Sequence, residues 1–143
     1  YVFDAEFEQT FAYKDFIPNT RNNQIAKYIL VQLEKFETGM PLNEDDVTLE
    51  HILPCSPDEK VWKWDDGKIQ QYRYRLGNMI LLEAKKNRDI GNTSFAEKKT
   101  AYAASSIPTA KKIAELDIEE WTEETIESRQ HKMALAAKTI WAI

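Results

Sequence analysis

Apolar residues occur in short runs separated by charged residues, and this limits how much sheet the chain can form. Two runs have strand character. Residues 47–53 are apolar, β-branched and partly alternating before Pro54, and residues 79–82 are a continuous Met-Ile-Leu-Leu. The remaining apolar residues follow helical spacing. We therefore expect an α+β fold that is mainly α, with two short strands embedded in about five or six helices.

A long helix is predicted over residues 20–37. Its apolar residues recur at spacings of three and four, as one face of a helix requires, and Gly39 and Pro41 stop it. The residues of this face are Ile25, Tyr28, Ile29, Gln32, Leu33 and Phe36. The acidic residues 43–46 that follow are expected to form a loop.

Three further helices are predicted towards the C-terminus from their first residues. Ser94 and Glu97 have the spacing of a capping box and open one helix. Pro108 opens a second, short helix, and Thr122 opens the last one. His131, in this last helix, is expected to be exposed and structural.

The signals between the two strands are weaker. Residues 57–74 fit a short helix or an irregular segment, with a turn at residues 65–67. Gly77 and Asn78 fit a tight turn or a bulge before the second strand.

The composition excludes several classes of protein. Hydrophobic residues make up 43% and aromatic residues 11% of the chain, which is too rich in core formers to be disordered. No apolar run approaches the roughly 18 to 20 residues that span a bilayer, and no secretory signal is visible. The single cysteine, Cys55, can form neither an internal disulfide nor a multi-cysteine zinc site, which favours a reducing compartment, the cytoplasm.

Charge is distributed unevenly, although the formal net charge is only −5. Residues 1–59 carry 4 basic and 12 acidic side chains, residues 60–112 carry 12 and 5, and residues 113–143 carry 3 and 7. The middle region is a basic island between acidic flanks. A solvated lysine-rich face is the simpler interpretation, and a phosphate-binding surface is the alternative if chemistry lies within it.

Five polar residues in and beside this island have the chemistry of a hydrolytic metal site. Glu50 and His51 lie on the first predicted strand, and Asn78 lies at the second. Asn87 and Asn92 follow, just before a predicted helix. A neutral imidazole can take a proton from water, so His51 can be a general base, with a packed structural histidine as the alternative. Glu50 and Asn87 offer hard oxygen ligands for Mg²⁺ or Mn²⁺, and Asn78 can orient the imidazole.

The order of these motifs resembles a known family. Leu-Glu-His-Ile-Leu-Pro at 49–54 is followed by Leu-Gly-Asn-Met-Ile-Leu-Leu at 76–82 and then by Asn87, Asn92, Phe95 and Lys98. This series resembles the C-terminal HNH-like nuclease domain of the Gmr-type modification-dependent restriction endonucleases, which lies behind a ParB-like, nucleotide-hydrolysing N-terminal half. The resemblance runs from about Arg21 to the end, because the family's last helix has a pattern similar to Ile126, Arg129, Leu135 and Trp141.

The resemblance implies a ββα-metal motif, the HNH or His-Me finger, in which two antiparallel strands and a helix hold one divalent ion beside the scissile phosphate. It makes His51 the general base and Asn78 the residue that fixes the base or its strand. It makes Glu50 and Asn87 the metal ligands, with Asn87 at the head of the finger helix. The wider HNH group has an Asp in place of Glu50, so the direct ligand role of this residue is where the chain departs from the pattern.

At 143 residues the chain fits one domain. The resemblance divides it into a helical lead-in over residues 1–46, a ββα-metal core over residues 47–104 and C-terminal helices over residues 105–143. Because the chain begins with Tyr1 rather than Met, we expect it to be the C-terminal fragment of a longer protein.

The basic island surrounds the three motifs, where a phosphate-binding surface should lie if they form the site. Lys98 is expected to touch a phosphate or to stabilise transition-state charge, with a plain surface lysine as the alternative. For Asn92 the alternative is a helix cap. The interleaved aromatic residues, for which core packing or base stacking is expected, are Trp62, Trp64, Tyr72 and Tyr74. The basic residues expected to bind nucleic acid are Arg73, Arg75, Lys85, Lys86, Arg88 and Lys99.

The sequence thus predicts a metal-dependent DNA endonuclease domain of a restriction or phage-defence system, with water activated by His51. Its partners would be DNA and the ParB-like N-terminal domain, with no membrane. Cutting both strands requires two copies, as in a homodimer, or two successive events. The alternative is a catalytically silent module of the same fold that binds DNA or a partner, which the net negative charge and Glu50 favour. RNA is an alternative substrate, because the metal chemistry is indifferent to the sugar.

Overall fold

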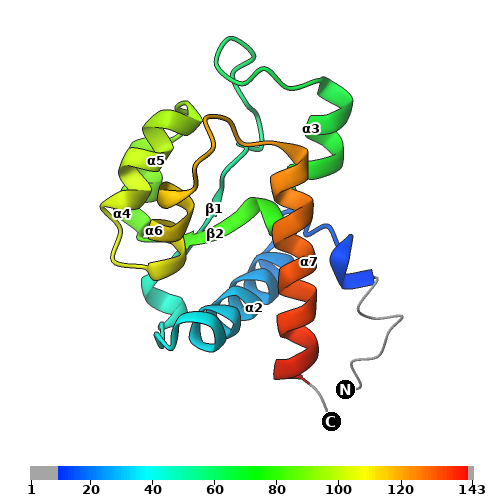
Figure 1. The fold of residues 1–143 in the computed structure, drawn as a ribbon, viewed down its shortest axis with the longest axis vertical. Coiled ribbons are helices and arrows are strands. Elements are labelled where there is room, and N and C mark those ends of the chain that lie inside the picture. The colour runs from blue at the N-terminus through cyan, green and yellow to red at the C-terminus, as the bar shows by residue number, and fades with distance from the viewer. Residues whose placement is uncertain (1–9, 142–143) are drawn as a thin grey trace.

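Two short antiparallel strands lie among helices in the computed structural model, which describes residues 10–141 (Figure 1). Strand β1 (Thr48–His51) pairs with strand β2 (Met79–Leu82), with His51 opposite Met79. The four residues of β2 are all buried, as their unbroken apolar run predicts. This two-stranded sheet within a helical chain confirms the predicted mainly α, α+β class.

Six α-helices and two 3₁₀ turns, whose bounds are given below, surround the strands within the described residues, and residues 10–12 are also α-helical. In Figure 1, helices α4, α5 and α6 stand together on one side of the strands, and α2 packs against both strands and against α7. No helix in this part of the chain is long and apolar enough to cross a membrane. The elements are α2 (Thr20–Thr38), η1 (Glu44–Asp46), α3 (Asp66–Tyr72), η2 (Leu76–Asn78), α4 (Ala84–Ile90), α5 (Phe95–Ala103), α6 (Pro108–Glu115) and α7 (Glu123–Ile140).

The helix starts that the sequence marks are confirmed. The Ser94 hydroxyl accepts the Glu97 amide at 3.2 Å and caps α5, and the Thr122 hydroxyl accepts the Thr125 amide at 3.4 Å and caps α7. Pro108 is in the first turn of α6, where its missing N–H removes no helical bond. Helix α2 ends at Gly39, whose φ of 76° is a conformation that glycine adopts readily.

The apolar face predicted for α2 agrees with its buried face only in part, since Leu33 is buried and Ile29 packs against the core. Ile25, Tyr28 and Phe36 are exposed, Phe36 to 50%. Eight apolar residues between 25 and 36 surround most of this helix, so more than one face satisfies the spacing rule and packing on the strands selects among them. The buried residues of α2 are Ala26, Leu30, Val31, Leu33 and Glu34.

Near the strands, the short helix predicted within residues 57–74 is confirmed as α3, but the turn predicted at residues 65–67 is wrong. Residues 65–67 are not a turn but the start of α3, where the Asp65 carboxylate accepts the Gly67 amide at 3.1 Å. Gly77 and Asn78 lie in the 3₁₀ turn η2, which confirms the tight turn predicted there and excludes the bulge. Helix α4, which begins directly after β2, was not separated from the loop before α5.

Helix α7 packs against η2 and contacts the start of β2. A Cβ built on Gly77 would lie 2.3 Å from the carbonyl oxygen of Ile126, so only glycine allows this close approach. The Arg129 guanidinium donates to the carbonyl oxygens of Gly77 at 2.5 Å and Met79 at 3.2 Å. These contacts fix the end of β2 that lies opposite His51.

The buried side-chain amide of Gln130 on α7 hydrogen bonds to two segments far away in the sequence, residues 11–14 and residues 75–77. Its Oε1 accepts from Arg75 Nε at 3.1 Å and from the Gly77 amide at 2.9 Å. Its Nε2 donates to the carbonyl oxygens of Phe11 and Lys14, both at 3.0 Å. One side chain of α7 thus ties the first described residues to the turn before β2.

Candidate active site

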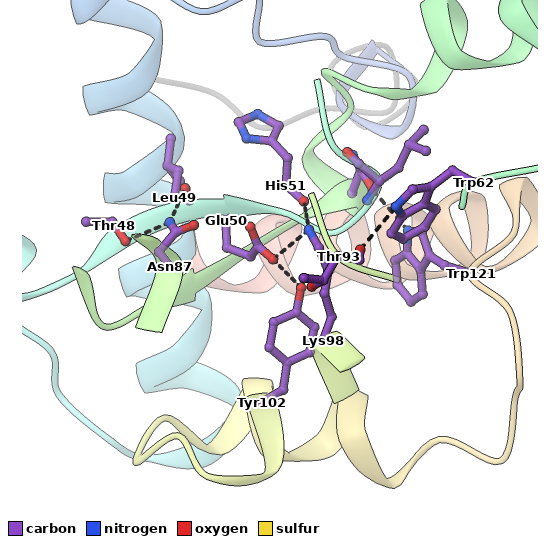
Figure 2. A network of polar contacts seen from close by, with 12 residues as sticks. Thr48, Leu49, Glu50, His51, Trp62, Asn87, Thr93, Lys98, Tyr102 and Trp121 are labelled. Carbon is purple, nitrogen blue, oxygen red and sulfur yellow. Dashed lines mark hydrogen bonds and ion pairs between the residues drawn. The ribbon is translucent and has the colours of Figure 1, made fainter. Parts of the chain in front are cut away.

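The end of β1 presents two of the predicted site side chains, Glu50 and His51, in opposite directions. Successive side chains of a strand point to opposite faces, and Figure 2 shows the His51 ring on one side of β1 and the Glu50 carboxylate on the other. Glu50 and His51, which are adjacent in the predicted motif, therefore lie in two different environments. The Glu50 side chain faces α5, and the His51 side chain faces away from it.

The environment of Glu50 is a buried ionic network. Lys98 on α5 donates to Glu50 Oε2 at 3.0 Å and to the carbonyl oxygen of His51 at 2.9 Å. The Tyr102 hydroxyl, one turn further along α5, donates to the same Oε2 (Figure 2). Lys98 is 0% and Glu50 4% exposed, so water does not compete for these bonds.

Burial and pairing act against each other in this network. Burial raises the pKa of Glu50 and lowers the pKa of Lys98, and the attraction between the two charges opposes both shifts. The pKa of Tyr102 is raised, first by burial and then by the negative charge of Glu50. The Tyr102 hydroxyl therefore keeps its proton and acts as a donor.

The environment of His51 leaves one ring nitrogen without a partner. Among the described residues no group hydrogen bonds to His51 Nε2, which is buried. Burial, with a smaller contribution from the Lys98 charge, lowers the pKa of His51 to about 4. The imidazole is therefore neutral at physiological pH, and the same shift makes it a weaker base than an exposed imidazole.

Two side chains of the segment before η2 flank the imidazole. The Tyr74 ring meets the His51 ring edge-on at 6.4 Å between centroids. The Arg73 guanidinium lies 4.6 Å from the centre of the Tyr74 ring and donates to the carbonyl oxygen of Cys55 at 3.0 Å. Of the predicted DNA-binding residues, Arg73 is thereby placed next to a residue that contacts His51.

Asn87 lies within α4 and not at its head, contrary to the prediction. Its Nδ2 donates to Thr48 Oγ1 at 2.9 Å and to the carbonyl oxygen of Leu49 at 2.8 Å. Figure 2 shows the Asn87 side chain on the same side of β1 as the Glu50 carboxylate. The fold thus brings the two predicted metal ligands to one side of the strand and the predicted base to the other.

Asn78 fixes the chain after His51 and does not bind its imidazole. Its Oδ1 accepts from the Leu53 amide at 2.8 Å and from Trp121 Nε1 at 2.9 Å. Its Nδ2 donates to the carbonyl oxygens of Leu53 at 2.9 Å and Arg73 at 3.0 Å. Because the Asn78 amide takes both main-chain groups of Leu53, β1 ends at His51, two residues earlier than predicted.

By type, two donor groups suit a hard divalent cation, but the Glu50 carboxylate is 4% exposed and its Oε2 is bonded to Lys98 and Tyr102. Residues 10–141 contain no group of three or more His, Cys, Asp or Glu side chains that could hold a metal ion. One carboxylate, Glu50, and one amide oxygen, Asn87, are a set that suits Mg²⁺ or Mn²⁺, since such ions keep several waters and take substrate phosphate oxygens as ligands.

The chain matches the family described as GmrSD restriction endonucleases, C-terminal domain, over residues 1–136. It belongs to this family. No curated protein matches the chain. The match confirms the family resemblance drawn from the three motifs and places the chain among domains of restriction endonucleases, which are nucleases that act on DNA.

Three basic residues of this GmrSD domain are placed differently from the prediction. Arg75 is 4% exposed and donates to Gln130 and to the carbonyl oxygen of Ala12, so it is not on the surface. Lys99 donates to the carbonyl oxygens at residues 116 and 118 at 3.0 Å and holds the chain after α6. Lys98 is neither a surface lysine nor open to a phosphate, because Glu50 and the main chain take its ammonium.

Other predicted residues remain on the surface of the GmrSD domain. Lys85 and Arg88 on α4 are exposed and Lys86 is half-buried. Asn92 is exposed and donates to the carbonyl oxygen of Ser56, so it is not the cap of α5. Of the four aromatic residues interleaved with the basic island, Trp62 and Tyr72 are buried, which favours core packing over base stacking for these two.

The sequence analysis missed Tyr102 as a member of the site. The spacing of four that places Tyr102 beside Lys98 on one face of α5 was available. Because Lys98 was expected to touch a phosphate, no buried partner was predicted on its face of α5.

Proposed function

We propose that this GmrSD domain is an HNH-type, metal-dependent DNA endonuclease that hydrolyses phosphodiester bonds with water activated by His51. Strands β1 and β2 and helix α4 follow one another in the order of a ββα-metal motif and form its proposed core. Residues 1–143 act in this proposal as one nuclease domain of a cytoplasmic restriction or phage-defence protein.

The observation that carries the proposal is the unpartnered, buried Nε2 of His51. A buried polar atom without a partner is costly and rare, and it is retained where chemistry needs it. The neutral imidazole takes a proton from the attacking water at this nitrogen. The Lys98 bond to the His51 carbonyl oxygen holds the main chain that carries the base.

Glu50 and Asn87 would hold one Mg²⁺ or Mn²⁺ ion on the α4 side of β1. When bound, such an ion offsets the charge that develops on the phosphate and on the leaving oxygen. Asn87 keeps its carbonyl oxygen for this task, because its Nδ2 makes both of its bonds to β1. Lys98 and Tyr102 hold the Glu50 carboxylate through Oε2.

DNA would lie along the surface that carries Arg73 and the exposed part of α4. Lys85, Lys86 and Arg88 supply the positive charge there, and Arg73 lies beside the ring that contacts His51. The proposed partners besides DNA are a ParB-like, nucleotide-hydrolysing N-terminal domain and a second copy for cutting both strands.

A catalytically silent module that binds DNA or a partner is the second candidate. The observation in its favour is the buried pair of Glu50 with Lys98, which gives this carboxylate a structural role without any metal. The two candidates differ in one respect that can be measured, which is metal-dependent cleavage.

Plasmid nicking separates the two candidates. The wild-type chain, His51→Ala and the matched control His131→Ala are incubated with plasmid DNA and Mg²⁺, Mn²⁺ or EDTA. His131 is exposed on α7, far along the chain from the site. We expect metal-dependent nicking by the wild type and by His131→Ala, and a loss of about 10² to 10⁴ in rate for His51→Ala. Absence of nicking by a folded wild type with every metal favours the silent module.

A further inference from the structure

The ring of Tyr74 lies against His51, on the face of β1 that points away from α5. The two rings meet edge-on, with 6.4 Å between their centroids and an angle of 84° between their planes. Tyr74 is half-buried, and the Nε2 atom of His51 is buried. The atom that takes the proton of the attacking water in the proposed function is therefore shielded in this arrangement.

No hydrogen bond from a described residue holds the Tyr74 side chain. Its hydroxyl has no partner, and the Arg73 guanidinium lies over its ring at 4.6 Å from the centre. The main chain is fixed instead. The side chain of Asn78 donates to the carbonyl oxygen of Arg73 at 3.0 Å, and the Phe16 amide donates to that of Tyr74 at 2.7 Å. The Tyr74 ring can thus change rotamer while the chain that carries it stays in place.

Two nitrogens beside the Tyr74 ring are unsatisfied. His51 Nε2 and Arg73 Nε are both buried without a hydrogen-bond partner among residues 10–141. Buried polar groups are nearly always bonded, because an unmade bond costs the full desolvation of the group. A ring that contacts two such groups therefore occupies a place in which polar atoms would be more favourable. This is the arrangement expected of a temporary cover and not of a permanent core contact.

We propose that Tyr74 is a gate over His51 and that the Arg73 guanidinium holds it shut when no DNA is bound. The inference rests on the proposed role of His51 as the base, since that role gives the gate an atom to shield. The contact of a cation with a ring is weak at a partly exposed site, whereas bonds between arginine and phosphate are charge-assisted and often bidentate. A DNA phosphate is thus the stronger partner for Arg73, and its arrival frees the ring.

Access to His51 can be measured without cleavage. Diethyl pyrocarbonate modifies neutral imidazoles, and the chain has two histidines, so mass spectrometry of their peptides follows His51 and His131 separately. The full chain and Tyr74→Ala are compared at neutral pH without metal or DNA. The matched control is Tyr13→Ala, because the Tyr13 ring contacts His131 at 5.7 Å and 89° and also lies 5.4 Å from the Arg75 guanidinium.

We expect Tyr74→Ala to raise the rate of His51 modification by about 10-fold, the factor that one ring contact and one cation contact of ordinary strength provide together. Tyr13→Ala should leave the His51 rate unchanged. Tyr74→Phe should also leave it unchanged, because the hydroxyl has no bond to lose. Equal His51 rates in the wild type and a folded Tyr74→Ala overturn the gate. A wild-type His51 that reacts as fast as the exposed His131 overturns it as well.

Arg73→Gln tests the hold on the gate and takes the place of Tyr74→Ala if that variant does not fold. It keeps the Tyr74 ring but removes the guanidinium, so the His51 rate should rise by a smaller factor of about 3-fold. An unchanged rate overturns the proposal that Arg73 holds the ring.

Plasmid nicking by the same preparations separates the gate from the proposed function. If His51 becomes accessible in Tyr74→Ala but no preparation nicks DNA with any metal, the gate is supported and the role of His51 as the base is not. If the wild type nicks DNA while His51 is equally accessible in every variant, the gate is overturned and the proposed function stands.

Discussion

The two sides of β1 differ in how completely their polar groups are satisfied. On the side of α5, the carboxylate of Glu50 is bonded to Lys98 and Tyr102, and all three side chains are buried. On the other side, His51 has a buried ring nitrogen with no partner among the described residues. Adjacent residues of one strand thus combine a fully bonded carboxylate with a ring nitrogen that has no hydrogen-bond partner among the described residues.

Hydrogen bonding distinguishes side chains that hold the structure from candidate reactive side chains more clearly than the amino-acid composition does. Bonded polar groups in a buried network fix geometry, whereas an unsatisfied group retains the capacity to bind or to take a proton. Substitutions of Glu50, Lys98 or Tyr102 should therefore lower the free energy of unfolding. Substitutions of His51 should change activity with little effect on stability.

The largest loss of stability is expected for Lys98→Met. It leaves a charged Glu50 buried without its partner, which costs about 3 to 5 kcal/mol of the free energy of unfolding. Urea unfolding followed by circular dichroism measures this change. Adding Glu50→Gln should restore most of the stability, and a double variant as unstable as Lys98→Met would contradict the ion-pair explanation.

A smaller loss is expected for Gly77→Ala, which tests whether α7 supports the strands as strictly as α5 does. The new Cβ would meet the Ile126 carbonyl oxygen at 2.3 Å, and the main chain must move to relieve the clash. Overpacking of this kind costs about 1 to 3 kcal/mol. Gly67→Ala, where the nearest atom would be 3.9 Å away, is the matched control in the same urea experiment, and equal losses would remove the close approach as the cause.

A pH-dependent contribution is expected from Glu83, a carboxylate at the other end of β2. Burial raises the pKa of Glu83, but bonds from the Ser105 hydroxyl and the Ser106 amide outweigh it, so the net pKa is lowered. A carboxylate with a lowered pKa stabilises the fold above its unfolded value, and the stabilisation disappears as pH falls through the folded value.

Glu83→Gln measures this contribution. The difference in melting temperature between the wild type and Glu83→Gln should be largest at neutral pH and should shrink in acid, below the ordinary glutamate pKa of 4.5. Because Glu83 is partly exposed, the effect should stay below about 1 kcal/mol. A difference that is constant from neutral to acid pH would assign the effect to shape and not to charge.

The smallest loss of stability is expected for His51→Gln, together with the largest loss of activity. Removing an unpartnered nitrogen breaks no hydrogen bond, so the free energy of unfolding should change by less than about 1 kcal/mol. Urea unfolding and plasmid nicking on the same preparation measure both quantities. A large loss of stability would mean that the imidazole is structural and would end the contrast between the two sides.

Elements whose ends are set by local chemistry were predictable from the sequence. The capping residues Ser94 and Thr122, the stop at Gly39 and the buried run of β2 are decided within a few residues of the chain. The buried face of α2 was not predictable from the sequence, because apolar residues surround most of that helix. Only its packing on the strands selects the buried residues, such as Ala26 and Leu30. Tertiary contacts decide where local patterns allow more than one answer.

The fold brings several of the predicted site residues close to β1 but divides them between its two faces, which the sequence did not predict. The order of the motifs identified Glu50, His51, Asn78 and Asn87, which the fold gathers around β1. Charge misled the assignment of Lys98 and Arg75, since lysine and arginine are rarely buried and both were placed on the surface. Their partners come from segments far away in the sequence, and no local pattern shows such pairs.

The bonds of Gln130 have a consequence for the order in which the protein matures during synthesis. Its amide holds Phe11 and Lys14, more than a hundred residues earlier, and also the turn at Gly77. Contacts between residues so distant in the chain form late in folding. A growing polypeptide that ends before Gln130 lacks every one of these bonds. The turn before β2 therefore gains these bonds only after residue 130 has been synthesised, and an incomplete copy lacks them.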